Sequence, residues 1–361
     1  MVDRVVWVSN ETPDRGGQGG QRRQYFQIAA LRAAGIDVEV VSLAGEQDDS
    51  SIREIAAVQR IVRGRRRPWA TLRGRALIRH ALAQRDIAVI VAHSESWPLV
   101  RRAVRRGAGA PVLVDLHNVW GSWYRARGEE ESAADWDERE RALTVEADAL
   151  SFCSPDEAAR LPIGGSAVRI VAPHGVDPQE WPQPRSRGAG APRIGAFGNW
   201  WWEPNRDGVR WFLDEVWPLV RSARPDVRLR IAGAGLEERC AGAPGVDALG
   251  RVPELGALID EVDVVVVPIR GGVGAPVKFA EALASGRPVV ATTGASGGLS
   301  DVPARLGDHP DQWARDILHL LADPREAERL GRQGRRYARE ELSWASTTAP
   351  IVDWIRRQRS R

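Results

Sequence analysis

Short apolar runs that alternate with stretches of helical periodicity constrain the fold of this chain more than any other feature. The first unit comprises the run RVVWVSN at residues 4–10, a Gly-rich stretch, the helical pattern RRQYFQIAALRAAG at residues 22–35, and the run IDVEVVSL. Strands that alternate with helices predict a parallel sheet covered on both faces. Further apolar runs of this kind occupy residues 87–93, 110–117, 149–154 and 168–175.

The pattern restarts after a Pro-, Gly- and Arg-rich stretch. We predict a Rossmann-like domain over residues 1–176, a linker over 177–192, a second Rossmann-like domain over 193–343, and a C-terminal helix over 344–361 that packs back across the domains. The predicted class is α/β, with two doubly wound parallel sheets. Ligands of such sheets bind at the carboxyl ends of the strands, so a cleft between the domains is the expected site.

Composition excludes several other classes of protein. The 361 residues are enough for two domain cores. Cys153 and Cys240 fall in different predicted domains, which predicts neither a disulfide framework nor a cysteine-based metal site. The chain shows no signal-peptide pattern and no apolar run of the roughly 20 residues that cross a bilayer, so a cytoplasmic location is expected.

Arginine is concentrated in residues 60–79 and in the run RRAVRR at residues 101–106. One interpretation is a solvated helix face, balanced by the acidic segment at 129–141. The other is peripheral contact with an anionic membrane surface or with nucleic acid. No RNA-binding signature or zinc spacing accompanies the arginines, which makes nucleic acid the weaker hypothesis.

Lys278 is the only lysine in a chain with 51 basic residues. Pro276 suits the start of a helix, while Gly286 and Pro288 suit its end, so the spacing predicts a helix over residues 276–285. Lys278 then lies in the first turn, where the helix dipole disfavours a cation unless an anion is bound as well. This placement indicates a phosphate-binding site.

Glu281 follows one helical turn later, on the same face as Lys278. Its carboxylate could accept hydrogen bonds from the hydroxyls of a ribose. It could also form a simple ion pair with Lys278, worth ~0.2–0.5 kcal/mol. The spacing alone leaves both interpretations open.

The stretch GGVGAPVKFAEALASGRPVVAT at residues 271–292 resembles the donor-binding signature of the retaining glycosyltransferases of GT-B fold, family 4. Glu281, Ala282, Gly286 and the Pro-Val-Val run match that signature, but Val273 stands where most members have an earlier Glu. The resemblance implies that Glu281 holds the nucleotide ribose and Lys278 the diphosphate. It also implies that the sugar is held by backbone N–H groups of the segment Gly272, Val273, Gly274 and Ala275.

The resemblance extends to the rest of the predicted donor domain. RIGAFGN resembles the opening strand, which ends at Gly198, and Trp200, Trp201 and Trp202 follow where many members have Arg and Lys. Arg206 is then a second, weaker candidate for the diphosphate. The segment LGRVPEL at residues 249–255 resembles the loop that borders the base, which implies recognition by backbone groups around Arg251 and Val252.

The first domain resembles the same family at two points. Gly19 and Gly20 match the first Gly-rich loop, where donor phosphate and acceptor approach the backbone. His117 follows a buried strand and matches the family's histidine near the donor sugar. Both features have structural alternatives, namely a flexible loop and a core histidine. We interpret His174 as structural.

The expected function is therefore retaining transfer of a sugar from a nucleotide-diphosphate sugar to a hydroxyl acceptor. The acceptor could be a polysaccharide, a lipid carrier or a secondary metabolite. The resemblance implies that neither a metal ion nor another cofactor is needed. Two alternatives are a sugar-nucleotide epimerase or hydrolase of the same fold, and a non-catalytic binding scaffold.

Overall fold

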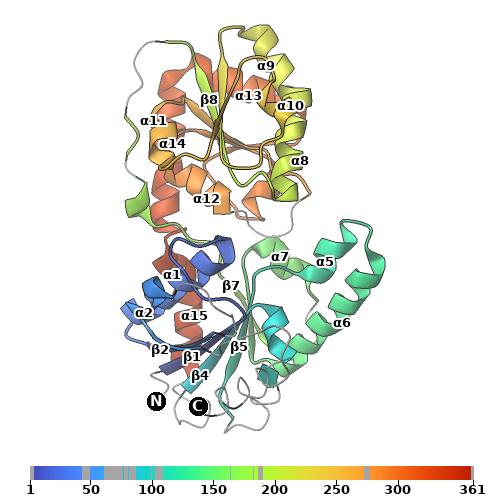
Figure 1. Ribbon diagram of the computed structural model, residues 1–361, viewed down its shortest axis with the longest axis vertical. Helices are drawn as coiled ribbons and strands as arrows, with labels where there is room; N and C mark the ends of the chain where they lie inside the picture. The colour runs from blue at the N-terminus through green and yellow to red at the C-terminus, as the bar shows by residue number, and fades with distance from the viewer. Residues whose placement is uncertain are drawn as a thin grey trace. The chain divides into compact units, whose positions relative to one another are not determined.

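The computed structural model describes residues 4–42, 49–60, 87–98, 100–101, 109–162, 164–181, 183–185, 190–271 and 277–358, together with residues 76 and 80. The chain divides into two compact units. Unit 1 comprises residues 1–175 and 344–361, and unit 2 comprises residues 176–343. Each unit has its own sheet, with helices on both faces (Figure 1).

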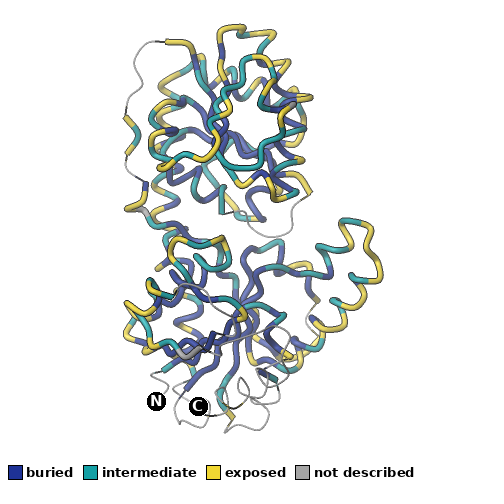
Figure 2. Tube along the Cα trace, in the orientation of Figure 1, coloured by how far each residue is buried: buried dark blue, intermediate teal, exposed yellow. Residues whose placement is uncertain are grey.

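The sheet of unit 1 is entirely parallel, in the order β3-β2-β1-β4-β5-β6-β7. The strands β1, β2, β4, β5 and β6 are almost wholly buried, and they include dark blue segments of Figure 2. This burial explains why the strands read as unbroken apolar runs in the sequence. Their bounds are β1 Arg4–Ser9, β2 Asp37–Ser42, β3 Ala57–Arg60, β4 Ile87–Ala92, β5 Val112–Leu116, β6 Ala149–Phe152 and β7 Val168–Val171.

Alternate residues of β1 pack against different helices. Val5 and Trp7 belong to a cluster that includes residues of α1 and α15, whereas Val6 and Val8 belong to a cluster that includes residues of α6 and α7. The C-terminal helix α15 is part of unit 1, and its Trp344 stacks on Phe26 of α1 with ring centroids 5.3 Å apart. The helices are α1 Gly19–Ala33, α2 Ser50–Arg53, α5 Trp120–Arg125, α6 Glu130–Glu146, α7 Pro155–Arg160 and α15 Trp344–Gln358, with a 3₁₀ turn η1 at Ser94–Ser96.

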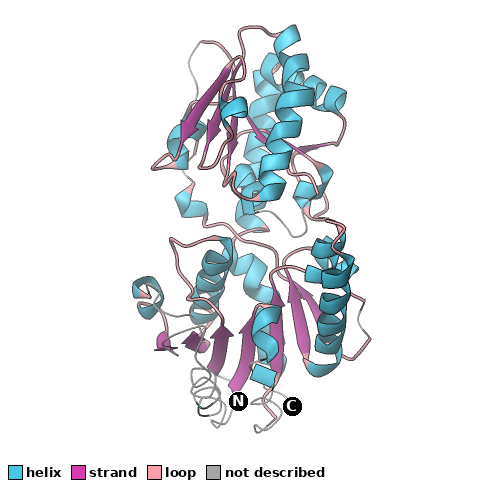
Figure 3. Cartoon of the chain, turned by 45° about the vertical axis from the view of Figure 1, so that its right-hand side comes forward, coloured by secondary structure: helices cyan, strands magenta, loops and turns pink. Residues whose placement is uncertain are grey.

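The sheet of unit 2 is also parallel, in the order β10-β9-β8-β11-β12-β13. Figure 3 draws the strands of both sheets in magenta. Its strands are β8 Arg193–Phe197, β9 Arg228–Ala232, β10 Val246–Gly250, β11 Val264–Val267, β12 Val289–Ala291 and β13 Arg305–Leu306. Its helices are α8 Glu203–Trp211, α9 Trp217–Ala223, α10 Glu238–Ala241, α11 Leu255–Asp260, α12 Val277–Ala284, α13 Pro310–Ala322 and α14 Pro324–Glu340, with short turns η2 Pro178–Glu180 and η4 Thr293–Ser296. The predicted fold class, two Rossmann-like doubly wound parallel sheets, is confirmed.

Both sheets reverse their strand order once, between β1 and β4 in unit 1 and between β8 and β11 in unit 2. The helices that follow the two strands at such a reversal cover opposite faces of the sheet. In unit 2, α8 contributes to one core cluster and α12 to the other. Loops at the carboxyl ends of these strands therefore border a space where α/β sheets bind ligands.

The first helical segment of unit 2 contains an irregular turn. α8 begins at Glu203, and it is joined to α9 by a π-helical turn over Phe212–Val216. Pro218 is the second residue after this turn, and its ring nitrogen has no hydrogen to donate to the preceding turn. The wider π turn accommodates this proline within a nearly continuous helix.

Of the two arginine clusters, only Arg60 and Arg101 fall among the described residues. Arg60 ends β3, and Arg101 forms an ion pair with Glu146 of α6. In the part of the chain that the structure describes, no helix combines the length and apolar character needed to cross a membrane.

Glu140 is a fully buried carboxylate on α6 that accepts hydrogen bonds from the backbone N–H groups of Trp120 (2.6 Å) and Gly121 (3.2 Å). Burial raises its pKa to about 7, in spite of these hydrogen bonds, and nearby Asp137 and Glu157 raise it further. The folded state therefore binds this proton more tightly than the unfolded state does.

We expect the contribution of Glu140 to the free energy of unfolding to fall by at most ~3 kcal/mol as the pH rises from about 4.5 to about 7. Glu140→Gln should remove that part of the pH dependence, whereas Glu138→Gln, at an exposed position of α6, should retain it. Urea denaturation at pH 5 and pH 7.5 measures the difference. An equal pH dependence in the wild type and Glu140→Gln would show that this carboxylate is not responsible.

Candidate active site

A small pocket lies at the reversal point of unit 2. Its lining includes Phe197 and Trp200 from the end of β8 and the loop after it, Asn205 from α8, Val267 and Ile269 at the end of β11, and Lys278 from α12. The two loops that the strand order brings together thus supply a charged group and an aromatic wall.

Lys278 lies against Gly198 in this pocket. A Cβ atom at position 198 would be 2.5 Å from Lys278 Cε and 3.6 Å from Nζ, so only glycine admits the lysine at this distance. Burial lowers the pKa of Lys278, while the charge of Glu281 acts in the opposite direction. Among the described residues, the Nζ group makes no hydrogen bond or ion pair, so it has its donors available for an anion.

The loop after β8 is fixed by its own hydrogen bonds. The Asn205 side chain donates to the Asn199 carbonyl (2.7 Å), and the buried Trp200 indole donates to the Ala232 carbonyl (3.1 Å). Trp201 and Trp202 differ from Trp200, because they are 73% and 43% exposed. Of the three tryptophans, Trp200 belongs to the core and the other two are exposed.

The other predicted residues of unit 2 are more dispersed. Arg206 lies in the first turn of α8, with its Nε 3.6 Å from Asp207 Oδ1, and does not line the pocket. Arg251 is exposed just after β10, and Val252 packs against the core cluster that contains α12. The segment Gly272, Val273, Gly274 and Ala275 lies outside the described residues.

In unit 1 the Gly-rich loop and His117 come together. Gly19 and Gly20 begin α1, and His117 directly follows β5. A Cβ atom at position 20 would lie 3.3 Å from His117 Nδ1 and 2.8 Å from Glu11 Oε1. Gly20 therefore allows a close approach of the helix start to both side chains.

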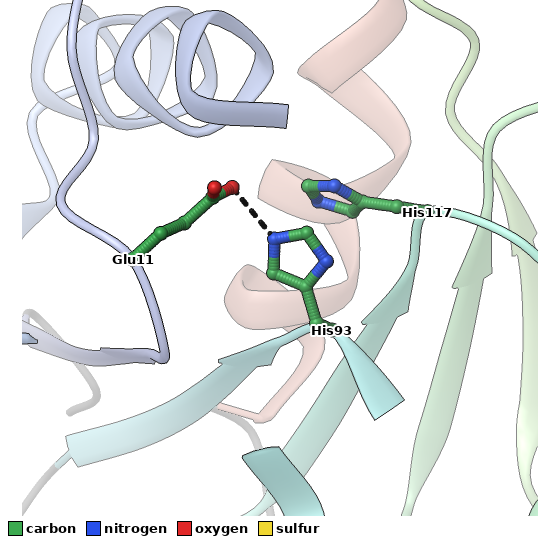
Figure 4. A group of neighbouring side chains, drawn as sticks. All are labelled: Glu11, His93 and His117. Carbon is green, nitrogen blue, oxygen red and sulfur yellow. Dashed lines mark hydrogen bonds and ion pairs between the residues drawn. The ribbon is translucent and has the colours of Figure 1, made fainter. Parts of the chain in front are cut away.

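Two residues that the sequence analysis did not single out, Glu11 and His93, complete this cluster (Figure 4). Glu11 follows β1 and His93 follows β4, so they meet at the reversal point of the sheet. Glu11 Oε1 lies 2.8 Å from His93 Nε2, and the His93 and His117 rings are 3.8 Å apart between centroids. In the sequence, only the position of Glu11 and His93 just after predicted strands indicated that they could lie at a site.

His93 has a backbone φ of 68°, which is uncommon for a residue other than glycine. Its N–H donates to the Asp115 carbonyl (3.0 Å), and its carbonyl accepts from the Ser96 N–H (3.1 Å). Such a conformation costs of order 1–3 kcal/mol and persists only where the surroundings impose it. In this conformation the imidazole contacts Glu11.

A buried ion pair lies beneath the histidines. Arg23 of α1 donates two hydrogen bonds to Asp115 of β5 (3.0 and 2.8 Å), and both side chains are fully buried. Ser151 of β6 donates a third, at 2.7 Å. Burial alone would raise the pKa of Asp115, but Arg23 and His117 hold it well below its usual value.

His117 lies beside this pair, with Nε2 3.2 Å from Asp115 Oδ2, although the geometry of this contact is not that of a hydrogen bond. Burial lowers the pKa of His117 to about 4, and the charge of His93 adds to this effect, while Asp115 opposes it. The imidazole is therefore neutral at pH 7. With a proton on Nε2 facing Asp115, the Nδ1 lone pair faces the Gly20 side of the cluster.

His174 lies after β7, with its ring 6.4 Å from that of Trp344. Burial, together with the charges of Arg23 and His117, lowers its pKa well below the usual value. Its role as a structural residue stays a prediction.

Comparison with known proteins identifies the family to which this arrangement belongs. Residues 18–175 match the model of the glycosyl transferase 4-like domain, and residues 191–323 match that of the glycosyl transferases group 1. The two matches occupy most of both units. The chain belongs to the group 1 glycosyltransferases.

Two curated relatives of this glycosyltransferase match part of the chain. A GDP-mannose-dependent monoacylated alpha-(1-6)-phosphatidylinositol monomannoside mannosyltransferase of Corynebacterium glutamicum is 32% identical over 152 residues, which are 37% of this chain and 39% of the relative. An MMP alpha-(1->4)-mannosyltransferase of Mycolicibacterium hassiacum is 36% identical over 108 residues, 27% of this chain and 25% of the relative. The matched stretch thus spans well under half of either relative.

Solved structures match the whole fold at low identity. Sucrose-phosphate synthase from Thermosynechococcus elongatus has a TM-score of 0.77 at 16% identity, covering 99% of both chains. Anabaena HepE in complex with UDP-glucose has a TM-score of 0.71 at 15% identity, again covering 99% of both chains. At this identity the likeness establishes the GT-B fold.

We expect Asp115→Asn to destabilise unit 1 by ~3–5 kcal/mol, because it leaves the Arg23 charge buried without its partner. Asp135→Asn, at an exposed position of α6, is the matched control and should change stability by no more than ~0.5 kcal/mol. Urea denaturation followed by circular dichroism gives both values. A loss below ~1 kcal/mol for Asp115→Asn would contradict the importance assigned to this pair.

Proposed function

We propose that this glycosyltransferase moves a sugar, with retention of anomeric configuration, from a nucleotide-diphosphate sugar to a hydroxyl acceptor, and that the transfer needs no divalent metal ion. The observation that carries the proposal is Lys278, half-buried against Gly198 at the reversal point of unit 2. The chain has no other lysine, and this one is positioned where a parallel sheet binds ligands.

The chemistry of the departing nucleoside diphosphate would explain why a lysine lies in this pocket. Departure of a nucleoside diphosphate concentrates negative charge on its phosphate oxygens as the sugar carbon becomes cationic. A fixed ammonium in a site with little water stabilises that charge without further reorganisation. Lys278 would supply this stabilisation, with backbone N–H groups at the start of α12 as its partners.

Glu281 lies one turn further along α12 from Lys278, and it is also half-buried. We assign it to the ribose of the nucleotide, since a carboxylate can accept hydrogen bonds from both ribose hydroxyls. The diphosphate and the ribose would then be held by neighbouring turns of one helix. Base recognition is assigned to the backbone around Arg251 and Val252.

The unit 1 cluster serves the other side of the reaction in this proposal. Gly20 permits close approach of a ligand to the start of α1, where N–H groups favour anions. His117 is neutral and available through Nδ1, which suits a hydrogen bond to a sugar hydroxyl. Retention would follow from attack on the same face as the leaving group, with a donor phosphate oxygen taking the acceptor proton.

The relatives indicate which donors to try first. Both curated relatives are named as mannosyltransferases, one of them GDP-mannose-dependent, and HepE was solved with UDP-glucose. We propose GDP-mannose as the first candidate donor and UDP-glucose as the second. The acceptor is a hydroxyl of a polysaccharide, lipid carrier or secondary metabolite, and peripheral membrane contact through the arginine clusters would suit a lipid carrier.

We expect Lys278→Met to weaken binding of the cognate nucleoside diphosphate by ~10–100-fold, the worth of one hydrogen bond to a charged group. Glu281→Gln should weaken it as well. The controls are Arg332→Met and Glu328→Gln, an exposed ion pair on α14 whose loss should leave affinity unchanged. Calorimetric titration with GDP, UDP and their sugar conjugates measures all five proteins.

Equal affinity in Glu281→Gln and the wild type would remove this residue from the ribose site. Binding of none of the nucleotides by the folded wild type would contradict the proposed function altogether. Rapid consumption of the sugar nucleotide without an acceptor would favour an epimerase or hydrolase instead.

A further inference from the structure

The cluster of Glu11, His93 and His117 has a composition and spacing that hydrogen bonding does not fully satisfy. One donor atom from each of the three residues lies within 4.8 Å of the others. Two atoms bound to one zinc ion at ~2.1 Å and a tetrahedral angle are ~3.4 Å apart. Small rotations of the three side chains would therefore bring them around a single ion.

The contacts among Gln24, Glu11 and His93 compete with one another. Gln24 Oε1 accepts from the Trp7 indole (3.1 Å), which fixes the amide so that its nitrogen faces both Glu11 Oε1 (2.8 Å) and His93 Nε2 (3.1 Å). If His93 Nε2 carries a proton and donates it to Glu11, Nε2 cannot also accept from the Gln24 amide, and two N–H donors face each other. If it accepts from Gln24, its lone pair faces the carboxylate at 2.8 Å. A cation between Glu11 and His93 would satisfy both lone pairs.

His117 is arranged as a third ligand. Its Nε2 lies 3.2 Å from Asp115 Oδ2, and its Nδ1 lies beside Gly20, which also approaches Glu11. A carboxylate behind a ligating histidine fixes the ring and raises the basicity of its free nitrogen. Asp115 is itself fixed by Arg23 and Ser151.

The charge and the access of the cluster also fit a cation. The Arg23 charge balances that of Asp115, so the Glu11 carboxylate is the remaining acidic group of the cluster. The Glu11 and His93 side chains are 27% and 14% exposed, so an ion can enter from solvent. A bound ion would keep a fourth position for water, the coordination found in open zinc sites.

We propose that Glu11, His93 and His117 form a binding site for a divalent transition-metal ion of the zinc class. The binding does not depend on the proposed function. One consequence rests on the proposed function: because the ion would occupy His117, metal binding should lower the rate of glycosyl transfer.

The test uses the full chain, freed of metal with a chelator, and titrated with Zn²⁺ by calorimetry and with Co²⁺ by visible absorption. We expect one equivalent to bind, and His93→Gln and Glu11→Gln to weaken it by at least ~10-fold, because loss of even an outer partner costs ~10–100-fold. His309→Gln and Glu54→Gln, at exposed positions away from the cluster, are the matched controls and should bind as the wild type does.

A second pair of variants keeps all three ligands. In Gly20→Ala the new Cβ would lie 2.8 Å from Glu11 Oε1 and 3.3 Å from His117 Nδ1, so Zn²⁺ affinity should fall. In Gly16→Ala nothing lies within 4 Å of the new Cβ, so affinity should be unchanged. Circular dichroism establishes that each variant is folded.

Wild-type affinity in both His93→Gln and Glu11→Gln, or no binding of either metal by the wild type, would overturn the proposal. Binding is read directly from heat and absorption. Failure to find glycosyl transfer would therefore count against the proposed function and leave the metal result intact.

Discussion

The reversal of strand order in each parallel sheet is the constraint on which the candidate site depends. Strands on either side of the reversal send their following segments to opposite faces, as α8 and α12 show by belonging to different core clusters. The loops between strand and helix are left at one edge of the sheet, where backbone N–H groups and side chains converge. Lys278 with Gly198 in unit 2, and Gly20 with Glu11 and His93 in unit 1, all occupy such positions.

Burial fixes the charged side chains at these positions in one arrangement. The Arg23 and Asp115 pair has no solvent contact, and its geometry fixes α1 against β5 and orients His117. A buried pair of this kind contributes little net stability, but it is costly to break. It therefore serves to hold one arrangement of the site. The position of the Lys278 side chain depends on Gly198, because a Cβ atom there would lie 2.5 Å from Lys278 Cε.

The sequence predicted most of the fold, because strands buried on both faces produce apolar runs that are easy to recognise. It also predicted the helix that carries Lys278, since glycines and a proline beside it are local signals. The role of Lys278 at a diphosphate stays a prediction. Glu11 and His93 lie 82 positions apart in the chain, and only strand order brings them together. The positive φ of His93 and the π turn before α9 likewise depend on tertiary packing, which local propensity does not contain.

Hydrogen exchange during binding of a nucleoside diphosphate, with GDP and UDP tested in turn, examines the central claim most directly. If the reversal point of unit 2 holds the diphosphate, amide exchange should slow in residues 198–206 and 277–281, where loop and helix-start N–H groups gain partners. A nucleotide that binds while exchange slows only in other segments would contradict the account.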